Sequence, residues 1–338
     1  MPGETAKRAH GAAAPRGRRN AVLIGVLLAF VVVVVGGLIG ASVVRARHVA
    51  EPPKATATAT MSTSSAKKKL PASAEPASAS ASTLPTPVEV ADPALDQAVP
   101  VLMYHHILPV PSNFIAISPS TFDSQMKYLH DHGFHPVSIA ELQDFVLTGK
   151  RLPSKPVLIT FDDGRMNQLT YGVPILKKYG FTATFFVVRK WIVSSSKYFM
   201  HEPELKDLMA DGYDVQSHTT NHMMLYRFHS KSTGKYESYA SMKTRMWAAT
   251  EGMRVWMDKT LDGPPVTALA YPGGGNDKYT WQLAKEAGYE VAFTTNTGYV
   301  TYKGQDPLDL PRWNTGARGI TQATFVSIVS GAQHYKRK

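Results

Sequence analysis

From Val99 onward, the chain alternates between two patterns of hydrophobic positions. Short apolar runs such as Val99–Tyr104 and Val157–Phe161 have the length and β-branched content of buried strands. Between such runs, apolar residues recur every three or four positions, as Phe122, Met126 and Leu129 do, which is typical of an amphipathic helix. Strands and helices in alternation predict a parallel sheet covered by helices, either open or closed as a barrel.

The same reading places the other elements of this folded part, which shows no internal repeat. The further strands are expected at Phe134–Val137, Thr182–Val188, Tyr213–Gln216, Val266–Tyr271, Glu290–Thr294 and Asp309–Trp313. The further helices are expected at Ile139–Leu147, Pro174–Tyr179, Glu204–Ala210, Ser238–Met257, Asp277–Ala287 and Thr321–Ser330.

The segment Ala21–Val44 has a different pattern, with 24 consecutive residues and no charge. As a helix it would be about 36 Å long, enough to cross a hydrocarbon core of about 30 Å. Basic residues are more frequent before this segment than after it, which predicts a cytoplasmic tail at residues 1–20 and a chain that lies outside the cell after Val44. The alternative is a cleaved signal peptide, although its apolar stretch would run only about 7–15 residues.

Residues 45–97 form a third region, a linker that from position 49 onward is dominated by Ala, Ser, Thr and Pro. Such a composition buries too little apolar surface to offset the entropy of ordering, so we expect a disordered stalk. The folded domain is then expected at residues 98–338.

Composition and charge exclude several classes of function. The chain has no cysteine, which rules out disulfides and thiolate chemistry, so a metal ion must be held by His, Asp or Glu. The net charge of +11 is divided between the N-terminal 97 residues and the remainder without a long basic run. We therefore expect no nucleic-acid binding, and no feature of the sequence identifies a protein partner.

Two carboxylates end the apolar strand at Val157–Phe161, where Asp162 and Asp163 precede Gly164. Residues at the carboxyl ends of parallel strands line the functional site of such folds. On a regular strand, adjacent side chains point in opposite directions, so separate roles are expected, one carboxylate binding a metal and the other handling a proton. The alternative is that one of them only caps the following turn.

Two histidines, His218 and His222, follow another short strand four positions apart, close enough to bind one ion. Two histidines and one carboxylate leave coordination positions open for water and substrate, as in catalytic metal sites.

Two further strand ends are expected at the same rim. Gly273–Gly275 after Tyr271 allow close approach of a ligand, and their N–H groups could meet a developing oxyanion. His105 and His106 follow the first strand, and one of them could act as a general acid because histidine titrates near neutral pH.

Together these segments resemble the NodB-like polysaccharide deacetylases, carbohydrate esterase family 4. The motifs TFDDG at Thr160–Gly164 and HTTNH at His218–His222 carry the resemblance, which covers about Val99 to Ser330. The opening MYHHI at Met103–Ile107 and the later Leu310–Arg312 are similar to the subgroup that includes poly-N-acetylglucosamine deacetylases.

The resemblance implies a distorted parallel (β/α) barrel and a divalent metal, Zn²⁺ first and Co²⁺ or Ni²⁺ as alternatives. It implies Asp163, His218 and His222 as the metal ligands, and Asp162 as the general base. The N–H of Gly273 would then stabilise the oxyanion.

This chain departs from the family pattern at two positions. The family usually has an arginine two residues before the proline at 272, where Ala270 stands, and its late Leu-x-His motif is not recognisable, since His334 lies in a basic tail. The subgroup resemblance points to His105 as the general acid and to Arg312 as the residue that orients Asp162. Tyr271 and Trp313 are our candidates for substrate binding.

The sequence therefore predicts a hydrolase of non-peptide amide bonds that removes acetyl groups from an extracellular or cell-wall polysaccharide, most simply from N-acetylglucosamine units. We expect it to be a single-pass protein of the cell membrane, anchored by residues 21–44. One alternative is a carbohydrate-binding protein with an impaired site, which the missing arginine favours. The other is a small-molecule amidohydrolase, which the anchor and stalk disfavour because a diffusible substrate needs no tether.

Overall fold

The structure, a computed structural model, describes residues 96–275 and 277–332. The predicted basic tail, the apolar segment at 21–44, nearly all of the linker and His334 lie outside these residues. Within the described ranges, the helices are too short or too polar for any of them to cross a membrane.

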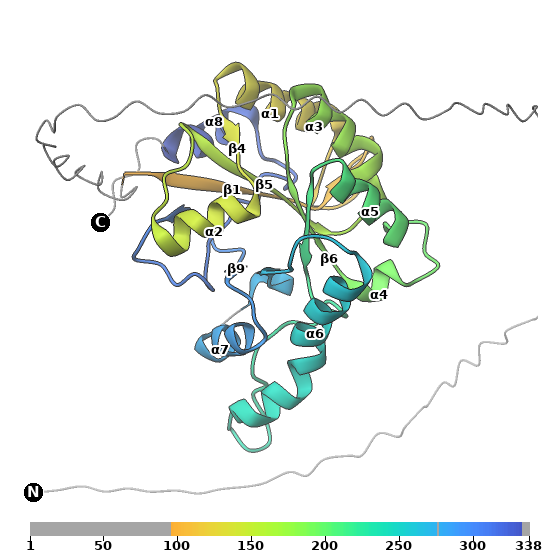
Figure 1. The fold of residues 1–338 in the computed structure, drawn as a ribbon, viewed down its shortest axis with the longest axis vertical. Helices are drawn as coiled ribbons and strands as arrows, with labels where there is room; N and C mark the ends of the chain where they lie inside the picture. Colours follow the sequence, from red (N-terminus) through yellow and green to blue (C-terminus); the bar gives the residue numbers. More distant parts are fainter. Residues whose placement is uncertain (1–95, 276, 333–338) are drawn as a thin grey trace, which may run out of the picture. The chain divides into compact units, whose positions relative to one another are not determined.

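A single curled sheet of eight strands organises the described part of the chain (Figure 1). Its order is β10–β1–β5–β6–β7–β8–β9, and the short β4 also pairs with β5. Neighbours run parallel, apart from β10, which is antiparallel to β1. The strands are β1 (Ala98–Tyr104), β4 (His135–Pro136), β5 (Pro156–Asp163), β6 (Thr184–Val187), β7 (Asp214–Ser217), β8 (Ala268–Ala270), β9 (Val291–Phe293) and β10 (Tyr299–Thr301), with a separate parallel pair β2 (His106–Ile107) and β3 (Ala116–Ile117).

The gap between the strands β9 and β1 is bridged by residues 310–313. On one side, the N–H of Leu310 donates to the carbonyl of Ala292 at 2.8 Å. On the other side, the N–H of Trp313 donates to the carbonyl of Val101 at 2.7 Å, and the N–H of Met103 donates to that of Trp313 at 2.8 Å. Only isolated bridges form here, so the expected strand at Asp309–Trp313 is not continuous. The sheet is a curled half-barrel, and this segment places Arg312 between its two ends.

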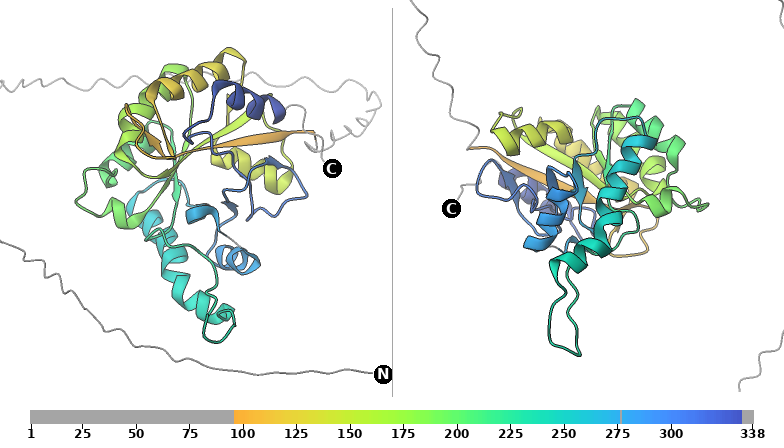
Figure 2. Two further views of the ribbon diagram at one scale, coloured as in Figure 1. Left: turned by 180° about the vertical axis from the view of Figure 1, so that it is seen from behind. Right: turned by 60° about the horizontal axis from the view of Figure 1, so that its bottom comes forward.

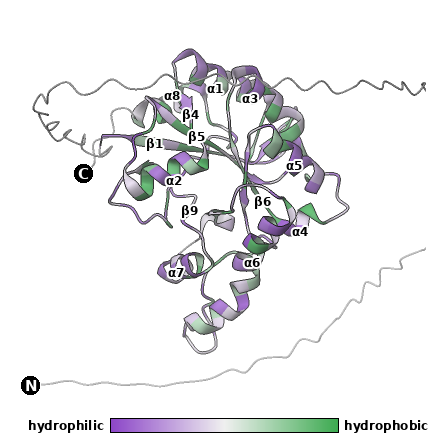
Figure 3. Ribbon diagram, viewed as in Figure 1, coloured by the Kyte–Doolittle hydropathy of each residue, from purple (hydrophilic) through white to green (hydrophobic). Residues whose placement is uncertain are grey.

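Both faces of the sheet are buried, which explains why its strands read as nearly continuous apolar runs. Alternate residues of one strand belong to different cores: Val101 and Leu158 to the inner face, Leu102 and Ile159 to the outer face. The inner core is completed by α2, through residues such as Phe145. Figure 3 shows hydrophobic positions along the central strands and hydrophilic ones on the surrounding helices.

The helices follow the amphipathic patterns of the sequence. Ser118 and Ser138 cap α1 and α2 with their hydroxyl oxygens, and Asp277 caps α7 in the same way with its carboxylate. The helices are α1 (Pro119–Asp131), α2 (Ile139–Thr148), the π-helical turn η1 (Gln168–Gly172), α3 (Val173–Tyr179), α4 (Arg189–Ile192), α5 (Glu202–Ala210), α6 (Tyr239–Thr260), the 3₁₀ turn η2 (Pro272–Gly274), α7 (Lys278–Glu286) and α8 (Gln322–Gly331).

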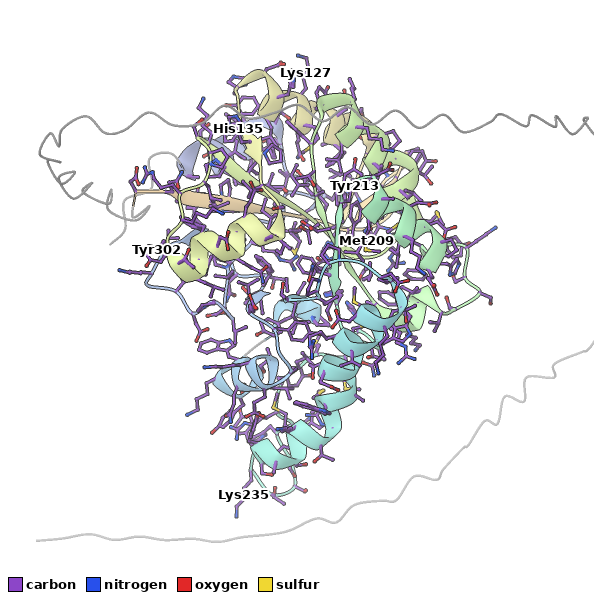
Figure 4. All side chains as sticks on the ribbon, viewed as in Figure 1. Lys127, His135, Met209, Tyr213, Lys235 and Tyr302 are labelled. Atoms are coloured by element: carbon purple, nitrogen blue, oxygen red, sulfur yellow. The ribbon has the colours of Figure 1, made fainter. Side chains whose placement is uncertain are left out.

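Most predicted elements are found within a few residues of their expected bounds, whereas β2, β3, β10, α4 and η1 were not predicted. A hairpin-like segment precedes α6 and projects from the sheet and helices (Figure 2, right). It is closed by an antiparallel bridge between His229 and Tyr236, and Figure 4 shows Lys235 near its tip.

Candidate active site

Four strand ends bring the predicted site residues into one cleft of about 440 Å³. His105 follows β1, Asp162 and Asp163 end β5, His218 follows β7 and Gly273 follows β8, and all of them line the cleft. The cleft lies at the carboxyl ends of parallel strands, where ligand sites of α/β folds are found.

The two adjacent aspartates both line this cleft. The reason is that β5 does not stay regular at its end, because Asp163 has a φ of 81° and the following Gly164 also has a positive φ. Such a backbone is rare for a residue with a side chain and is found where function requires it. The separate environments expected for the two carboxylates nevertheless exist, since each one contacts a different set of partners.

Asp163 lies with the two histidines of the HTTNH motif. Its Oδ1 is 3.8 Å from Nε2 of His218 and 3.5 Å from Nε2 of His222. The three potential ligand atoms lie within 4.8 Å of one another. The segment that carries the histidines is not helical, because Thr219 and His222 have positive φ, and the N–H of His222 donates to Oγ1 of Thr219 at 3.0 Å.

The donor set of this cluster fits a divalent ion. Oδ1 of Asp163 is buried and has no hydrogen-bond partner within the described part of the chain. Burying such an oxygen lowers the stability of the fold unless a ligand binds to it. Nδ1 of His218 lies 2.7 Å from the carbonyl of Ala270, which holds the tautomer that leaves Nε2 free to bind a metal. Burial also lowers the pKa of His218, so that its ring is neutral near pH 7.

Asp162 faces a buried arginine instead. Nη1 and Nη2 of Arg312 each donate to one carboxylate oxygen of Asp162 at 2.7 Å, a bidentate pair, and Nε donates to the carbonyl of Thr294 at 3.0 Å. Both side chains are almost fully buried. Burial raises the pKa of Asp162, but the charge and the two hydrogen bonds of Arg312 outweigh it, so the pKa lies well below its usual range and the carboxylate stays ionised.

The two histidines after β1 point to different surroundings. Nε2 of His105 is 3.8 Å from Oδ2 of Asp162, whereas Nδ1 of His106 is 3.2 Å from the side-chain amide of Asn167, in a neighbouring hollow. Burial lowers the pKa of His105, and burial together with the charge of Arg165 lowers that of His106 to about 4. Both rings are therefore neutral near pH 7.

The remaining predicted residues are placed as follows. Gly273 has a φ of 67°, which favours glycine, and lines the cleft. Tyr271 also contributes to the lining, but its ring is buried in the core and its hydroxyl donates to the carbonyl of Leu308 at 2.9 Å. Trp313 lines an adjacent hollow that shares Asn314 with the cleft. The roles of these three residues stay predictions.

Two residues that were not singled out in the sequence support the site. Arg165 donates to Oδ2 of Asp163 from Nε and Nη2, at 3.3 and 3.2 Å, and its guanidinium lies 4.5 Å from the ring centre of Phe199. Gln168, fully buried in η1, donates from Nε2 to the carbonyls of His105 and Asp162, at 2.7 and 2.6 Å. Arg165 stands two positions after Asp163, so its sequence position could have indicated a contact with that carboxylate. No local sequence pattern indicates a role for Gln168.

The comparisons with known proteins agree with this geometry. Residues 149–292 match the family model of the polysaccharide deacetylases. The chain is 28% identical over 229 residues to the putative polysaccharide deacetylase YxkH of Bacillus subtilis, covering 68% of this chain and 76% of that protein. It is 22% identical over 223 residues to the poly-β-1,6-N-acetyl-D-glucosamine N-deacetylase of Escherichia coli, covering 58% of this chain but only 33% of that enzyme.

Among solved structures, the Streptococcus pyogenes deacetylase PplD in complex with acetate is similar, with a TM-score of 0.55 and 28% identity. The match covers 64% of this chain and 91% of that chain. The chain therefore carries a polysaccharide deacetylase domain of the NodB type, which the family model matches at residues 149–292. The resemblance drawn from the two motifs and the prediction of an enzyme of this family are confirmed.

Proposed function

We propose that this domain removes acetyl groups from N-acetylglucosamine units of an extracellular or cell-wall polysaccharide, with a divalent metal in the cleft. The observation that carries the proposal is that Asp163, His218 and His222 converge in the same cleft as Asp162 and His105. The relative in Escherichia coli is named for poly-N-acetylglucosamine deacetylation, which supports this class of substrate. Imidazole and carboxylate ligands suit Zn²⁺ first, with Co²⁺ or Ni²⁺ as alternatives.

In the proposed mechanism, Asp163, His218 and His222 would hold the ion, and the atoms that face one another are Oδ1 of Asp163 and the Nε2 atoms of the two histidines. When bound, a divalent ion of this kind polarises the acetyl carbonyl and lowers the pKa of the attacking water toward about 7. Asp162 takes the proton of that water, and Arg312 keeps the carboxylate ionised and fixed in direction, at the expense of its strength as a base.

The other residues act on the acetyl group and on the leaving amine. Gly273 lines the cleft, and its N–H would stabilise the acetyl oxygen as negative charge develops on it. His105, neutral in the resting protein, receives at Nε2 the proton that Asp162 has taken from the water and delivers it to the leaving nitrogen, which leaves Asp162 ionised again.

The alternative of an impaired carbohydrate-binding protein loses its main support in this geometry. It depended on Ala270 standing where the family usually has an arginine. Arg312 supplies a guanidinium to Asp162 from a different segment, in a bidentate pair. We therefore propose that the site is catalytically competent.

The experiment that tests the function is an assay of released acetate on a panel of acetylated glycans, with and without a chelator. We expect chelation to abolish acetate release and added Zn²⁺, Co²⁺ or Ni²⁺ to restore it. Asp163→Asn, His218→Ala and His222→Ala should lose both metal and activity, because three ligands leave no redundancy. Asp162→Asn should lose activity and keep the metal.

Each other outcome has a definite meaning. Glycan binding without acetate release would favour the carbohydrate-binding alternative, and hydrolysis of small amides alone would favour the amidohydrolase. If Asp162→Asn loses the metal while Asp163→Asn keeps it, the two aspartates have been assigned in reverse.

We also propose that the domain lies outside the cell, tethered to the membrane by residues 21–44. The proposal is supported by the uncharged segment and its uneven basic flanks. Protease added to intact cells should release a soluble fragment beginning near residue 98. A fully protected domain would contradict this orientation, and a mature chain that starts near Val49 would indicate a cleaved signal peptide.

A further inference from the structure

A line of exposed apolar side chains begins two residues after the metal-ligand candidate His222. Met224, Tyr226 and Phe228 are 49%, 42% and 50% exposed, whereas Leu225 between them is fully buried. The buried Leu225 and the half-buried Arg227 alternate with them, so these three side chains share the exposed side of the segment. We call the three side chains the aromatic strip.

The aromatic strip is held in position by the residues on its opposite face. Leu225 packs in the core, and its carbonyl accepts a hydrogen bond from Oγ1 of Thr280 on α7. The guanidinium of Arg227 lies 3.9 Å from the ring centre of Tyr279, also on α7. The strip is therefore presented to solvent by a fixed backbone, a state that lowers the entropic cost of binding a ligand.

The end of the aromatic strip at Met224 lies next to the catalytic cleft. The Cε methyl of Met224 lies against Gly273, so close that a Cβ at this glycine would come within 3.0 Å of it. The ring of Tyr226 lies next to Gly275, where a Cβ would come within 3.8 Å of Cδ1. Gly273 lines the cleft, so the strip leads outward from the place where the acetyl group is expected.

We propose that the aromatic strip binds the part of the acetylated glycan chain that extends beyond the reacting sugar, an inference that rests on the proposed function. Pyranose rings have apolar C–H faces that pack on the faces of aromatic side chains. The ring centres of Tyr226 and Phe228 lie 6.2 Å apart, and Met224 lies against Gly273 at the cleft. The strip thus contacts the glycan chain at more than one place.

The charge of the surrounding segment agrees with an acetylated occupant. Residues 223–236 contain no Asp or Glu, but they include Arg227, Lys231 and Lys235. The carboxylate of Glu237 accepts from the N–H of Phe228, but its charge is paired with that of Arg245. An acetylated unit is neutral, whereas a deacetylated glucosamine unit carries a positive charge and gains no electrostatic attraction here. The strip therefore favours the substrate over the product.

The test compares a long substrate with one too small to reach the strip. Acetate release from an N-acetylated β-linked glucosamine oligosaccharide and from p-nitrophenyl acetate is measured for the wild type, Tyr226→Ala, Phe228→Ala and Tyr226→Phe. Leu147→Ala is the matched control, because Leu147 is similarly exposed at 46% but lines a different hollow. Each alanine variant should raise the KM for the oligosaccharide by about three- to tenfold and leave hydrolysis of the ester unchanged.

Tyr226→Phe, which keeps the ring, and Leu147→Ala should both behave like the wild type. An oligosaccharide KM that neither alanine variant changes would overturn the aromatic-strip proposal alone. Equal losses on the ester and the oligosaccharide would overturn it as well, because the strip would then support the cleft and not the glycan. A wild-type protein that hydrolyses the ester but neither binds nor deacetylates any glycan would overturn the proposed function together with this inference.

Discussion

Asp162 and Asp163 are neighbours in sequence, yet their side chains have different cationic partners. Arg312 engages both oxygens of Asp162, whereas Arg165 engages only Oδ2 of Asp163 and leaves Oδ1 to face the two histidines. A carboxylate with one oxygen held and one free is suited to bind an ion through a single atom. A carboxylate held at both oxygens is fixed in direction, as a group that exchanges a proton must be.

The first prediction at this scale concerns the two histidines after β1. His105→Ala should lower kcat by about 10²–10⁴-fold, the usual contribution of a general acid or base, with metal content unchanged. His106→Ala is the control, since His106 contacts Asn167 in a neighbouring hollow and should affect mainly stability. Single-turnover acetate release and metal analysis of both variants would check this. Near-full activity of the His105 variant with collapse of the His106 variant would contradict the assignment.

A second prediction concerns Arg165, which positions a metal ligand. Arg165→Ala should weaken metal affinity by about 10–100-fold, because partners that orient ligands have effects of this size, and Arg165→Lys should lie between it and the wild type. Competition with a chromogenic chelator measures the affinity directly. If repulsion between the guanidinium and the ion were the larger effect, the alanine variant would instead bind metal more tightly.

At the scale of elements, the sequence predicts the parts that local patterns encode and misses those that depend on tertiary contacts. The strands β1, β5 and β7 and both motifs at their ends could be predicted, because apolar runs followed by polar residues are local signals. The strand β10 was missed because its three residues are defined by pairing with β1. The expected strand at Asp309–Trp313 forms only isolated bridges to β9 and β1.

The same distinction holds for the site residues. Four of them, Asp162, Asp163, His218 and His222, stand in recognisable motifs. The sequence alone is therefore enough to identify them as candidate site residues. Gln168 could not be predicted, because its amide joins the ends of β1 and β5 only once the turn η1 has formed between β5 and α3. The pairing of Arg312 with Asp162 was expected from the family resemblance, and the closing segment at 310–313 gives its physical cause.

A third prediction belongs to the hairpin-like segment before α6. Glu237 at its base accepts hydrogen bonds from Arg245 on α6, and this pairing lowers the pKa of Glu237 from 4.5 to about 2. A carboxyl group whose pKa is lower in the folded protein stabilises the fold above its unfolded pKa. This contribution is therefore complete above pH 4.5 and is lost as the pH falls toward 2.

Glu237→Gln should lower the free energy of unfolding by about 1 kcal/mol at pH 7. The difference in this free energy between the variant and the wild type should shrink as the pH falls below 4.5. Amide exchange in residues 225–236 should increase in this variant. The matched control is Glu286→Gln, since Glu286 also has its pKa lowered to about 2, in this case by Lys243, but lies on α7. Exchange in the hairpin that is equally raised in the control would contradict a local role for the Glu237–Arg245 pair.

At the scale of the whole domain, the curled sheet brings together residues that are far apart in the chain. Asp163 ends β5, while His218 and His222 follow β7, and the cluster exists only when both strands are in place. An ion that binds this cluster binds the folded state and not the unfolded chain. It therefore stabilises the fold by mass action.

This coupling gives the last prediction. At a free metal concentration of 100 times the dissociation constant, stabilisation should be about 2.7 kcal/mol, which corresponds to a rise in Tm of about 5–11 °C for a domain of this size. Differential scanning calorimetry of the chelated and the metal-loaded protein measures it. Asp163→Asn should show the same Tm in both conditions, because its carboxylate ligand is gone, whereas Leu147→Ala should respond like the wild type. An equal response to metal in Asp163→Asn would place the ion elsewhere, and the absence of any shift in the wild type would contradict metal binding by the folded domain.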